Sequence, residues 1–190
     1  MCFRLDKKEF LTNLEKYDIL KFGEFILASG AKSEFYIDLR IIPFFPDFFA
    51  TIMKQLTDTL DSTDFDIVCG IPLAGLPFAT LIAHFSNKPL ILIRKTPKDH
   101  GLKKLIEGGD VKDKKVLVID DLVSSGFSKE FAIEELRKEG AVVDSLGVII
   151  DRREKESDAK AWEDEKGVKV LSLFKLGSEE ILTYGKNKKD

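Results

Sequence analysis

The sequence predicts an α/β fold with a central, mostly parallel sheet flanked by helices. Four short apolar runs, ending at Cys69, Ile93, Ile119 and Ile150, lack the alternation of half-exposed strands. Unbroken runs of this kind are typical of parallel strands that are buried on both faces. Stretches with helical spacing separate them, and this alternating order favours an open sheet with helices on both faces.

Length and composition agree with this class. The chain has 190 residues, 44% of them hydrophobic, which is enough for one domain with a real core. Its 30 Lys and Arg against 33 Asp and Glu leave a net charge of −3, which argues against a protein that coats nucleic acid. The longest apolar stretch, residues 41–50, is interrupted by two prolines and an aspartate and is too short to span a bilayer.

The first forty residues are expected to form a helix and a hairpin. Asp6 is a candidate N-cap for a helix that runs to about Leu20. Residues 22–27 and 35–39 have the pattern of two extended segments joined by a turn at 29–33, which predicts a hairpin. Pro46 suits the first turn of the next helix, whose apolar residues recur at helical spacing as far as Leu60.

The rest of the chain is expected to alternate strands and helices. The predicted strands cover residues 67–69, 90–93, 116–119 and 147–150, with a weaker fifth at 168–171. The predicted helices cover residues 76–85, 128–139 and 158–166. Cys69 ends an apolar run and is interpreted as a small buried hydrophobe. Two cysteines make no disulfide framework and no signal peptide is recognised, so a cytoplasmic protein is expected.

Two adjacent acids, Asp120 and Asp121, follow the strand at 116–119. In an open α/β sheet, ligands bind beyond the carboxyl ends of the strands. Hydroxyls and free N–H groups at a helix N-terminus bind phosphate, and acids beside them suit the hydroxyls of a phosphorylated sugar or a nearby Mg²⁺. A helix N-cap alone explains Ser128 but not the acid pair, so we favour a phosphosugar site. The loop concerned reads Leu122-Val123-Ser124-Ser125-Gly126-Phe127-Ser128.

Two other loops follow predicted strands. Between Arg94 and Lys104 lie five Lys or Arg residues, together with His100. A long cationic loop beside a phosphate site is interpreted as a lid over an anionic leaving group, with a solvated charged loop as an equal alternative. The turn at residues 70–77 is rich in Gly and Pro and opens a helix, so its backbone amides are candidates to hold a pyrophosphate.

Together these segments resemble the orotate phosphoribosyltransferase family, which is one of the type I phosphoribosyltransferases. The acid pair with its Ser-Ser-Gly loop is similar to the superfamily signature for 5-phosphoribosyl 1-pyrophosphate (PRPP). Residues 21–25, 29–30 and 35–40 resemble the N-terminal hairpin of the family, and residues 94–101 its catalytic loop. Asp151-Arg152 resembles the dipeptide that places an arginine on the orotate carboxylate. The resemblance implies the type I fold, with residues 1–40 contributing to a hood and residues 41–190 forming the PRPP-binding core of a single domain.

The resemblance also implies an activity. The 5-phosphoribosyl group passes from PRPP, carried with Mg²⁺, to orotate, and orotidine 5′-monophosphate and pyrophosphate result. The catalytic residues would be Lys98, His100 and Asp121. PRPP would bind Arg94, Lys95, Lys98, His100, Asp120, Asp121, Leu122, Val123, Ser124, Ser125, Gly126, Phe127 and Ser128, and orotate would bind Phe35, Tyr36, Ser124 and Arg152.

The implied partners are the two substrates and a second copy of the chain. No protein residue would ligate the metal directly, and no nucleic acid or membrane is involved. In the implied homodimer, loop residues 94–107 are shared across the subunits.

The sequence departs from the family pattern at several positions. Ala28 and Ala74 stand where family members often carry lysines, and Lys103 or Lys104 is a candidate to compensate. Phe127 is bulkier than the usual residue, and residues 153–156 lack the glycine often seen after the Asp-Arg dipeptide. Two alternatives stay open: a PRPP-sensing regulator without catalysis, and a purine-type phosphoribosyltransferase. Arg152 and the loop at residues 98–101 argue against the purine-type enzyme, and the retained Lys98 and His100 argue against the sensor.

Overall fold

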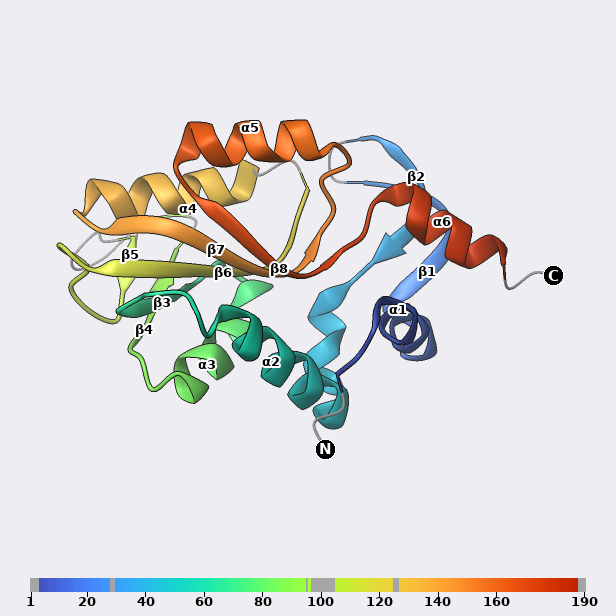
Figure 1. The fold of residues 1–190 in the computed structure, drawn as a ribbon, viewed down its shortest axis with the longest axis horizontal. Helices are drawn as coiled ribbons and strands as arrows, with labels where there is room; N and C mark the ends of the chain where they lie inside the picture. Colours follow the sequence, from blue (N-terminus) through green and yellow to red (C-terminus); the bar gives the residue numbers. More distant parts are fainter. Residues whose placement is uncertain (1–3, 28–29, 95, 97–104, 125–126, 188–190) are drawn as a thin grey trace.

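The structure is a computed structural model that describes residues 4–27, 30–94, 96, 105–124 and 127–187. Its centre is a six-stranded sheet (Figure 1). The edge strand β5 pairs antiparallel with β4, and every other described pair in this sheet is parallel, as the sequence predicts. The strands, in spatial order, are β5 (Ile106–Glu107), β4 (Leu90–Ile93), β3 (Ile67–Gly70), β6 (Lys115–Val123), β7 (Val142–Asp151) and β8 (Lys169–Lys175).

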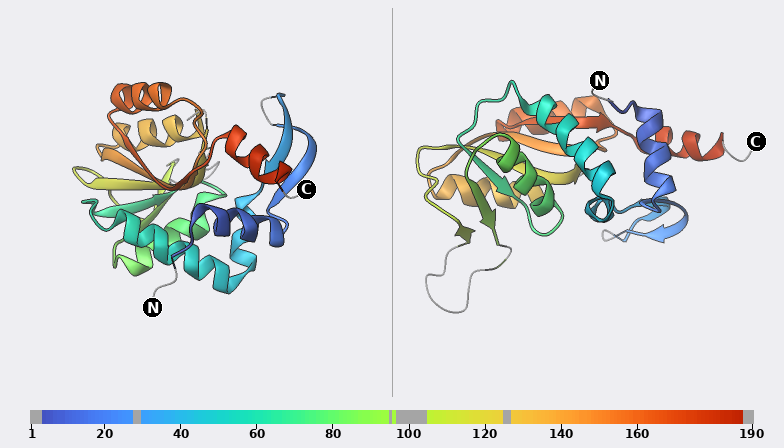
Figure 2. Two further views of the ribbon diagram at one scale, coloured as in Figure 1. Left: turned by 45° about the vertical axis from the view of Figure 1, so that its right-hand side comes forward. Right: turned by 90° about the horizontal axis from the view of Figure 1, so that it is seen from below.

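Helices cover both faces of this sheet. The helices α2 (Pro46–Leu60) and α3 (Gly75–Phe85) lie on one face, and α4 (Phe127–Lys138) and α5 (Glu156–Lys166) lie on the other (Figures 1 and 2). Pro46 occupies the first turn of α2, as predicted. Cys69 is fully buried in the sheet, and this burial raises the pKa of its thiol to about 12, which fits the predicted role as a small hydrophobe.

The first helix, α1 (Lys7–Lys16), begins where the sequence predicts but ends earlier. Asp6 and Glu9 form a capping box, in which each side chain accepts a hydrogen bond from the backbone N–H of the other residue. The prediction that this helix continues to about Leu20 is wrong. Asp18 adopts a left-handed backbone with φ 57°, and the chain turns so that Ile19 and Leu20 enter the core.

A two-stranded hairpin stands beside the main sheet. Its strands β1 (Leu20–Ile26) and β2 (Lys32–Ile37) pair antiparallel, which confirms the predicted hairpin, and the 3₁₀ helix η1 (Leu39–Phe44) follows. A C-terminal helix that the sequence analysis missed, α6 (Ser178–Lys186), lies beside the hairpin and meets β1 (Figure 2). The two are so close that a Cβ added to Gly185 would lie 2.6 Å from the Phe22 ring. The hydroxyl of Tyr184 also donates to Glu15 of α1, at 2.9 Å.

The strand order determines where a ligand is expected. The crossover after β3 passes over one face of the sheet through α3, and the crossover after β6 passes over the other through α4. At such a switch point the two loops diverge and leave a crevice at the carboxyl ends of the strands. The topology therefore directs attention to the loops after β3 and β6. Within the described ranges, no helix has the length and apolarity needed to cross a membrane.

Candidate active site

The acid pair lies at the carboxyl end of β6, as the sequence predicts. Asp120 is buried, with 4% of its surface exposed, and its Oδ2 lies 2.8 Å from the Nζ of Lys129 in the first turn of α4. Its Oδ1 accepts a hydrogen bond from the backbone N–H of Asp121, at 2.9 Å. This buried ion pair joins the end of β6 to the start of the helix that follows it.

Asp121 has a different environment. Its Oδ1 accepts a hydrogen bond from the backbone N–H of Leu122, at 2.7 Å. Burial and the negative charge of Asp120 raise the pKa of Asp121 to about 7, and Lys129 offsets only part of this shift. Two carboxyls beside one lysine therefore form a site in which Asp121 exchanges a proton near neutral pH.

Gly75 allows α3 to approach the acid pair. A Cβ at this position would lie 2.4 Å from the carbonyl oxygen of Ile119 and 3.0 Å from the Cα of Asp120. The preceding turn is anchored to the same strand, because the Ile71 N–H donates to the Ile119 carbonyl at 3.0 Å. A cis peptide bond joins Pro72 and Leu73 in this turn. The candidate pyrophosphate turn thus lies directly beside the acid pair.

The predicted loop begins later than the sequence indicates, because Leu122 and Val123 are the last two residues of β6. The side chain of Val123 is buried, and that of Leu122 is partly buried and packs against the core. Ser124 is exposed. Ser125 and Gly126 lie outside the described residues, as do the side chains of Phe127 and Ser128. The predicted phosphate cradle is therefore described only at its two ends.

Most of the predicted lid lies outside the described residues. This applies to Lys95, Lys98 and His100, to the two candidate compensating lysines, and to Ala28 in the hairpin turn. Arg94 is described at the end of β4. Its backbone N–H donates to the Leu105 carbonyl at 2.8 Å, and its guanidinium lies 3.6 Å from Glu107 of β5. These contacts close the base of the segment that carries the basic residues.

Arg152 follows β7 and reaches the hairpin. Its guanidinium carbon lies 4.8 Å from the centre of the Phe35 ring, so the structure brings two of the residues predicted for orotate together. Tyr36, the next residue along β2, points to the other face of the hairpin. There its hydroxyl accepts from Arg40 at 3.1 Å, and its ring centre lies 5.7 Å from that of Phe25.

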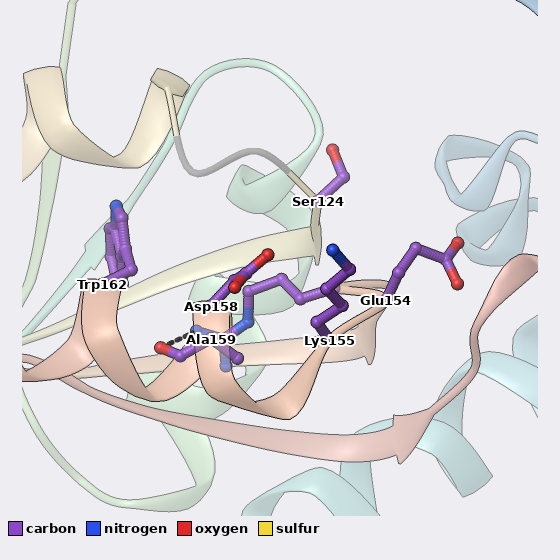
Figure 3. Close-up of a pocket in the computed structure, with 7 residues that line it drawn as sticks. Ser124, Glu154, Lys155, Asp158, Ala159 and Trp162 are labelled. Atoms are coloured by element: carbon purple, nitrogen blue, oxygen red, sulfur yellow. Dashed lines mark hydrogen bonds between the residues drawn. The ribbon is translucent and has the colours of Figure 1, made fainter.

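Ser124, also predicted for orotate, lines a cavity of about 300 Å³ between the loop after β6 and the start of α5 (Figure 3). The other walls come from residues 153–155 and from Asp158, Ala159 and Trp162. Trp162 also donates to Glu130 of α4, at 2.8 Å. This contact holds the two helices of this face together beside the predicted phosphate cradle.

The acid pair does not form a metal site by itself. In the part of the chain that the structure describes, no group of three or more His, Cys, Asp or Glu side chains is placed to hold a metal ion. Both carboxylate oxygens of Asp120 already have partners. A Mg²⁺ at this position would therefore take most of its oxygen ligands from a bound molecule.

Sequence reasoning missed Lys129. The signal for it was present, because a lysine in the first turn of a helix is opposed by the helix dipole and implies an acidic partner nearby. It also missed Glu154 and Ser178, whose contact spans 24 residues of sequence and depends on the unpredicted α6. No local sequence pattern predicts a hydrogen bond between residues that are so far apart in the chain.

Comparisons with known proteins agree with this geometry. Residues 44–170 match the family model described as the phosphoribosyl transferase domain. Orotate phosphoribosyltransferase from Staphylothermus marinus is 38% identical, covering 89% of this chain and 81% of its own length. The crystal structure of orotate phosphoribosyltransferase from Aeropyrum pernix superposes with a TM-score of 0.79 at 30% identity, covering 95% of this chain and 99% of that one. The structure of Leishmania donovani UMP synthase gives a TM-score of 0.80 at 33% identity, and 98% of this chain matches 40% of that longer chain.

The close approach at Gly75 leads to a test of stability. We expect Gly75→Ala to lower the free energy of unfolding by roughly 1–3 kcal/mol, because the new Cβ overlaps the Ile119 carbonyl oxygen. Urea unfolding curves measure this difference. Gly109→Ala is the control, because a Cβ there meets nothing within 4 Å. Equal losses in the two variants would contradict the account.

The raised pKa of Asp121 predicts a pH-dependent stability difference. The folded state holds this proton up to about pH 7, whereas a carboxyl in the unfolded chain loses it near pH 4, so wild-type stability falls as the pH rises from about 4 to about 7 and then levels off. Asp121→Asn removes this loss. We expect the free energy of unfolding of the variant to exceed that of wild type by roughly 1–3 kcal/mol at pH 8 and by much less at pH 5. Urea unfolding curves at the two pH values measure this difference. Asp61→Asn, at an exposed position, is the control, and a gap independent of pH would refute the assignment.

Proposed function

The chain belongs to the phosphoribosyltransferase family, and from this premise we propose that it transfers the 5-phosphoribosyl group of PRPP to orotate. The products are orotidine 5′-monophosphate and pyrophosphate, in a step of pyrimidine nucleotide synthesis. The observation that carries the choice of orotate is the partly buried guanidinium of Arg152 beside the Phe35 ring. A planar fork of donors next to an aromatic face suits an acceptor that joins a flat ring to a carboxylate.

The acid pair and the loop after it form the proposed PRPP side. Asp121 accepts hydrogen bonds from the ribose hydroxyls. Asp120 pairs with Lys129 and so holds the start of α4 in place. The segment from Ser124 to Ser128 binds the 5′-phosphate mainly through backbone N–H groups at the start of that helix. This use of the backbone tolerates the bulk of Phe127.

The reaction replaces one bond at the anomeric carbon of the ribose with another. A ring nitrogen of orotate forms a bond to this carbon, while the bond to the pyrophosphate oxygen breaks and its electron pair leaves with pyrophosphate. The proton of that ring nitrogen passes to the departing pyrophosphate. Positive charge develops on the sugar, where the Asp121 carboxylate stabilises it, and negative charge develops on the leaving group. Lys98 and His100 donate to that leaving group, and Arg94 and Lys95 contact its phosphates.

Magnesium enters this scheme with PRPP. When bound, Mg²⁺ neutralises part of the charge of the pyrophosphate group. The carboxyls at the end of β6 are suited to lie near the metal. Because both oxygens of Asp120 already have partners in the protein, the metal would be ligated mainly by oxygens of PRPP. Next to the metal, the acid pair and the loop after β6 hold the ribose hydroxyls and the 5′-phosphate.

The proposed organisation is a single domain that forms a homodimer in the cytoplasm. The hood of residues 1–40 is held to the core through α6, which contacts both α1 and β1. Phe44 and Leu73 are 81% and 78% exposed, which supports a partner subunit that covers apolar surface. In this dimer, residues 94–107 of one subunit complete the site of the other.

An absorbance assay tests the proposed activity. With PRPP and Mg²⁺, we expect the protein to consume orotate and to leave uracil, adenine and hypoxanthine unchanged. Lys98→Ala should lower kcat by about 100-fold or more while PRPP still binds, because the leaving group loses its donor. PRPP binding without turnover of any base would indicate a sensor, and consumption of a purine would indicate the purine-type enzyme. Near-normal turnover by Lys98→Ala would remove that lysine from the mechanism.

Mixing two inactive variants tests the shared site. Lys98→Ala and Asp121→Asn lose different halves of one site, so a mixed dimer carries one intact site and one site with both changes. We expect a refolded equimolar mixture to recover about a quarter of wild-type activity, because half of the dimers are mixed and each has one working site. Recovery close to zero would mean that each site is built from a single subunit.

A further inference from the structure

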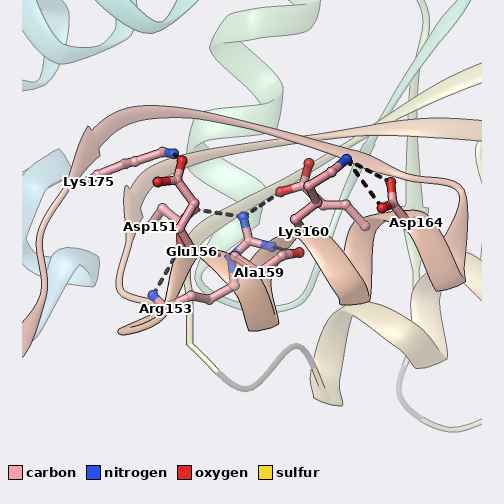
Figure 4. A network of polar contacts seen from close by, with 8 residues as sticks. Asp151, Arg153, Glu156, Ala159, Lys160, Asp164 and Lys175 are labelled. Atoms are coloured by element: carbon pink, nitrogen blue, oxygen red, sulfur yellow. Dashed lines mark hydrogen bonds and ion pairs between the residues drawn. The ribbon is translucent and has the colours of Figure 1, made fainter.

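Two consecutive arginines after β7 have opposite environments. Arg153 makes a bidentate pair with Asp151, at 2.9 and 2.7 Å, and its Nη2 also donates to Glu163 at 2.6 Å (Figure 4). Its Nη1 donates to the Ala159 carbonyl at 3.1 Å. Each of its three nitrogens donates to a protein acceptor on β7 or α5. Arg153 is therefore a structural cation that joins these two elements.

Arg152 lacks such partners. Its Nε is buried and, among the residues that the structure describes, has no hydrogen-bond acceptor. The one side-chain hydrogen bond that the structure gives it runs from Nη2 to the Oγ of Ser178, at 3.4 Å. Burial lowers the pKa of Arg152, and the charge of Glu154 opposes that shift. This guanidinium keeps donors available to a ligand in a partly desolvated place.

Ser178 is itself held by Glu154. The two carboxylate oxygens of Glu154 lie 3.0 and 3.2 Å from the backbone N–H of Ser178, which opens α6. The Oγ of Ser178 donates to the same carboxylate at 2.5 Å, and these hydrogen bonds lower the pKa of Glu154. Gly177 leaves space for the Glu154 carboxylate, because a Cβ at position 177 would lie 3.0 Å from Glu154 Oε2.

We propose that Glu154 and Ser178 are positioning residues that orient the Arg152 guanidinium toward the carboxylate of the acceptor base. Hydrogen bonds run in one direction, from Arg152 to Ser178 and from Ser178 to Glu154. The serine separates the two charges, so Glu154 fixes the arginine without occupying its free donors. The inference rests on the proposed function, because the acceptor is taken to be orotate.

The arrangement also gives α6 a function. Ser178 and Leu182 of this helix, together with Phe35 and other hairpin residues, line a cavity of about 550 Å³. The first turn of α6 thus lies against the wall of the hairpin and against Arg152 at the same time. A C-terminal helix outside the matched residues 44–170 then contributes to the choice of acceptor.

Steady-state kinetics of Ser178→Ala and Glu154→Gln test this role. We expect the KM for orotate to rise about tenfold in each variant, while kcat and the KM for PRPP change less than twofold, because only the carboxylate contact is misaligned. Glu180→Gln is the matched control. Glu180 is an acid in the first turn of α6, the turn that Glu154 contacts, but it pairs with Lys7 of α1, so no change in the KM for orotate is expected.

A double-mutant comparison separates positioning from general support of the fold. In an Arg152→Met background, Ser178→Ala should add no further increase in the KM for orotate, because the group it positions is gone. An equal increase in both backgrounds, or a parallel rise in the KM for PRPP, would overturn the proposal. Wild-type protein that leaves orotate unconsumed would refute the proposed function and this inference with it. Wild-type turnover with an unchanged KM in both single variants would refute the inference alone.

Discussion

The buried ion pair between Asp120 and Lys129 is the contact on which the arrangement of the site depends. Two adjacent carboxyls at the end of a buried strand repel each other, and one lysine 2.8 Å away compensates the deeper of them. The same contact attaches the first turn of α4 to β6, and Gly75 admits α3 beside it. Three elements thus converge on Asp120, and the next residue, Asp121, is the acid whose pKa is raised to about 7. Without the lysine, the buried charge of Asp120 would stand unpaired.

A second group of contacts organises the opposite side. Arg153 donates its hydrogen bonds to acidic partners and so holds the turn after β7 in place. Arg152 keeps free donors and lies against Phe35. The hairpin, α6 and β7 are far apart in sequence but meet here (Figures 1 and 2). One side of the crevice therefore suits a phosphorylated sugar, and the other suits a flat ring with a carboxylate. A transferase that joins two such substrates needs both sides at one sheet edge.

The sequence predicts much of this fold because its signals are local. Apolar runs locate the strands, and the acids after the run at 116–119 locate the carboxyl end of β6. The contact between Glu154 and Ser178 has no such signal, because it joins residues far apart in the sequence. Lys129 has only the indirect signal of a lysine in the first turn of a helix, which implies an acidic partner without naming it. The end of α1 was misplaced because burial of Ile19 and Leu20 overrides the helical pattern. The opposite faces of Phe35 and Tyr36 follow from strand alternation, yet their relation to Arg152 emerges only from the packing of the hairpin.

A crystal structure of the protein with orotidine 5′-monophosphate tests the central claim directly, since this molecule would span both sides of the crevice. The account predicts the base carboxylate on the guanidinium of Arg152, including its Nε, the ribose hydroxyls on Asp121, and the phosphate at the start of α4. Asp120 should keep its contact with Lys129. A carboxylate bound elsewhere, with the Nε of Arg152 still lacking an acceptor, would contradict the account.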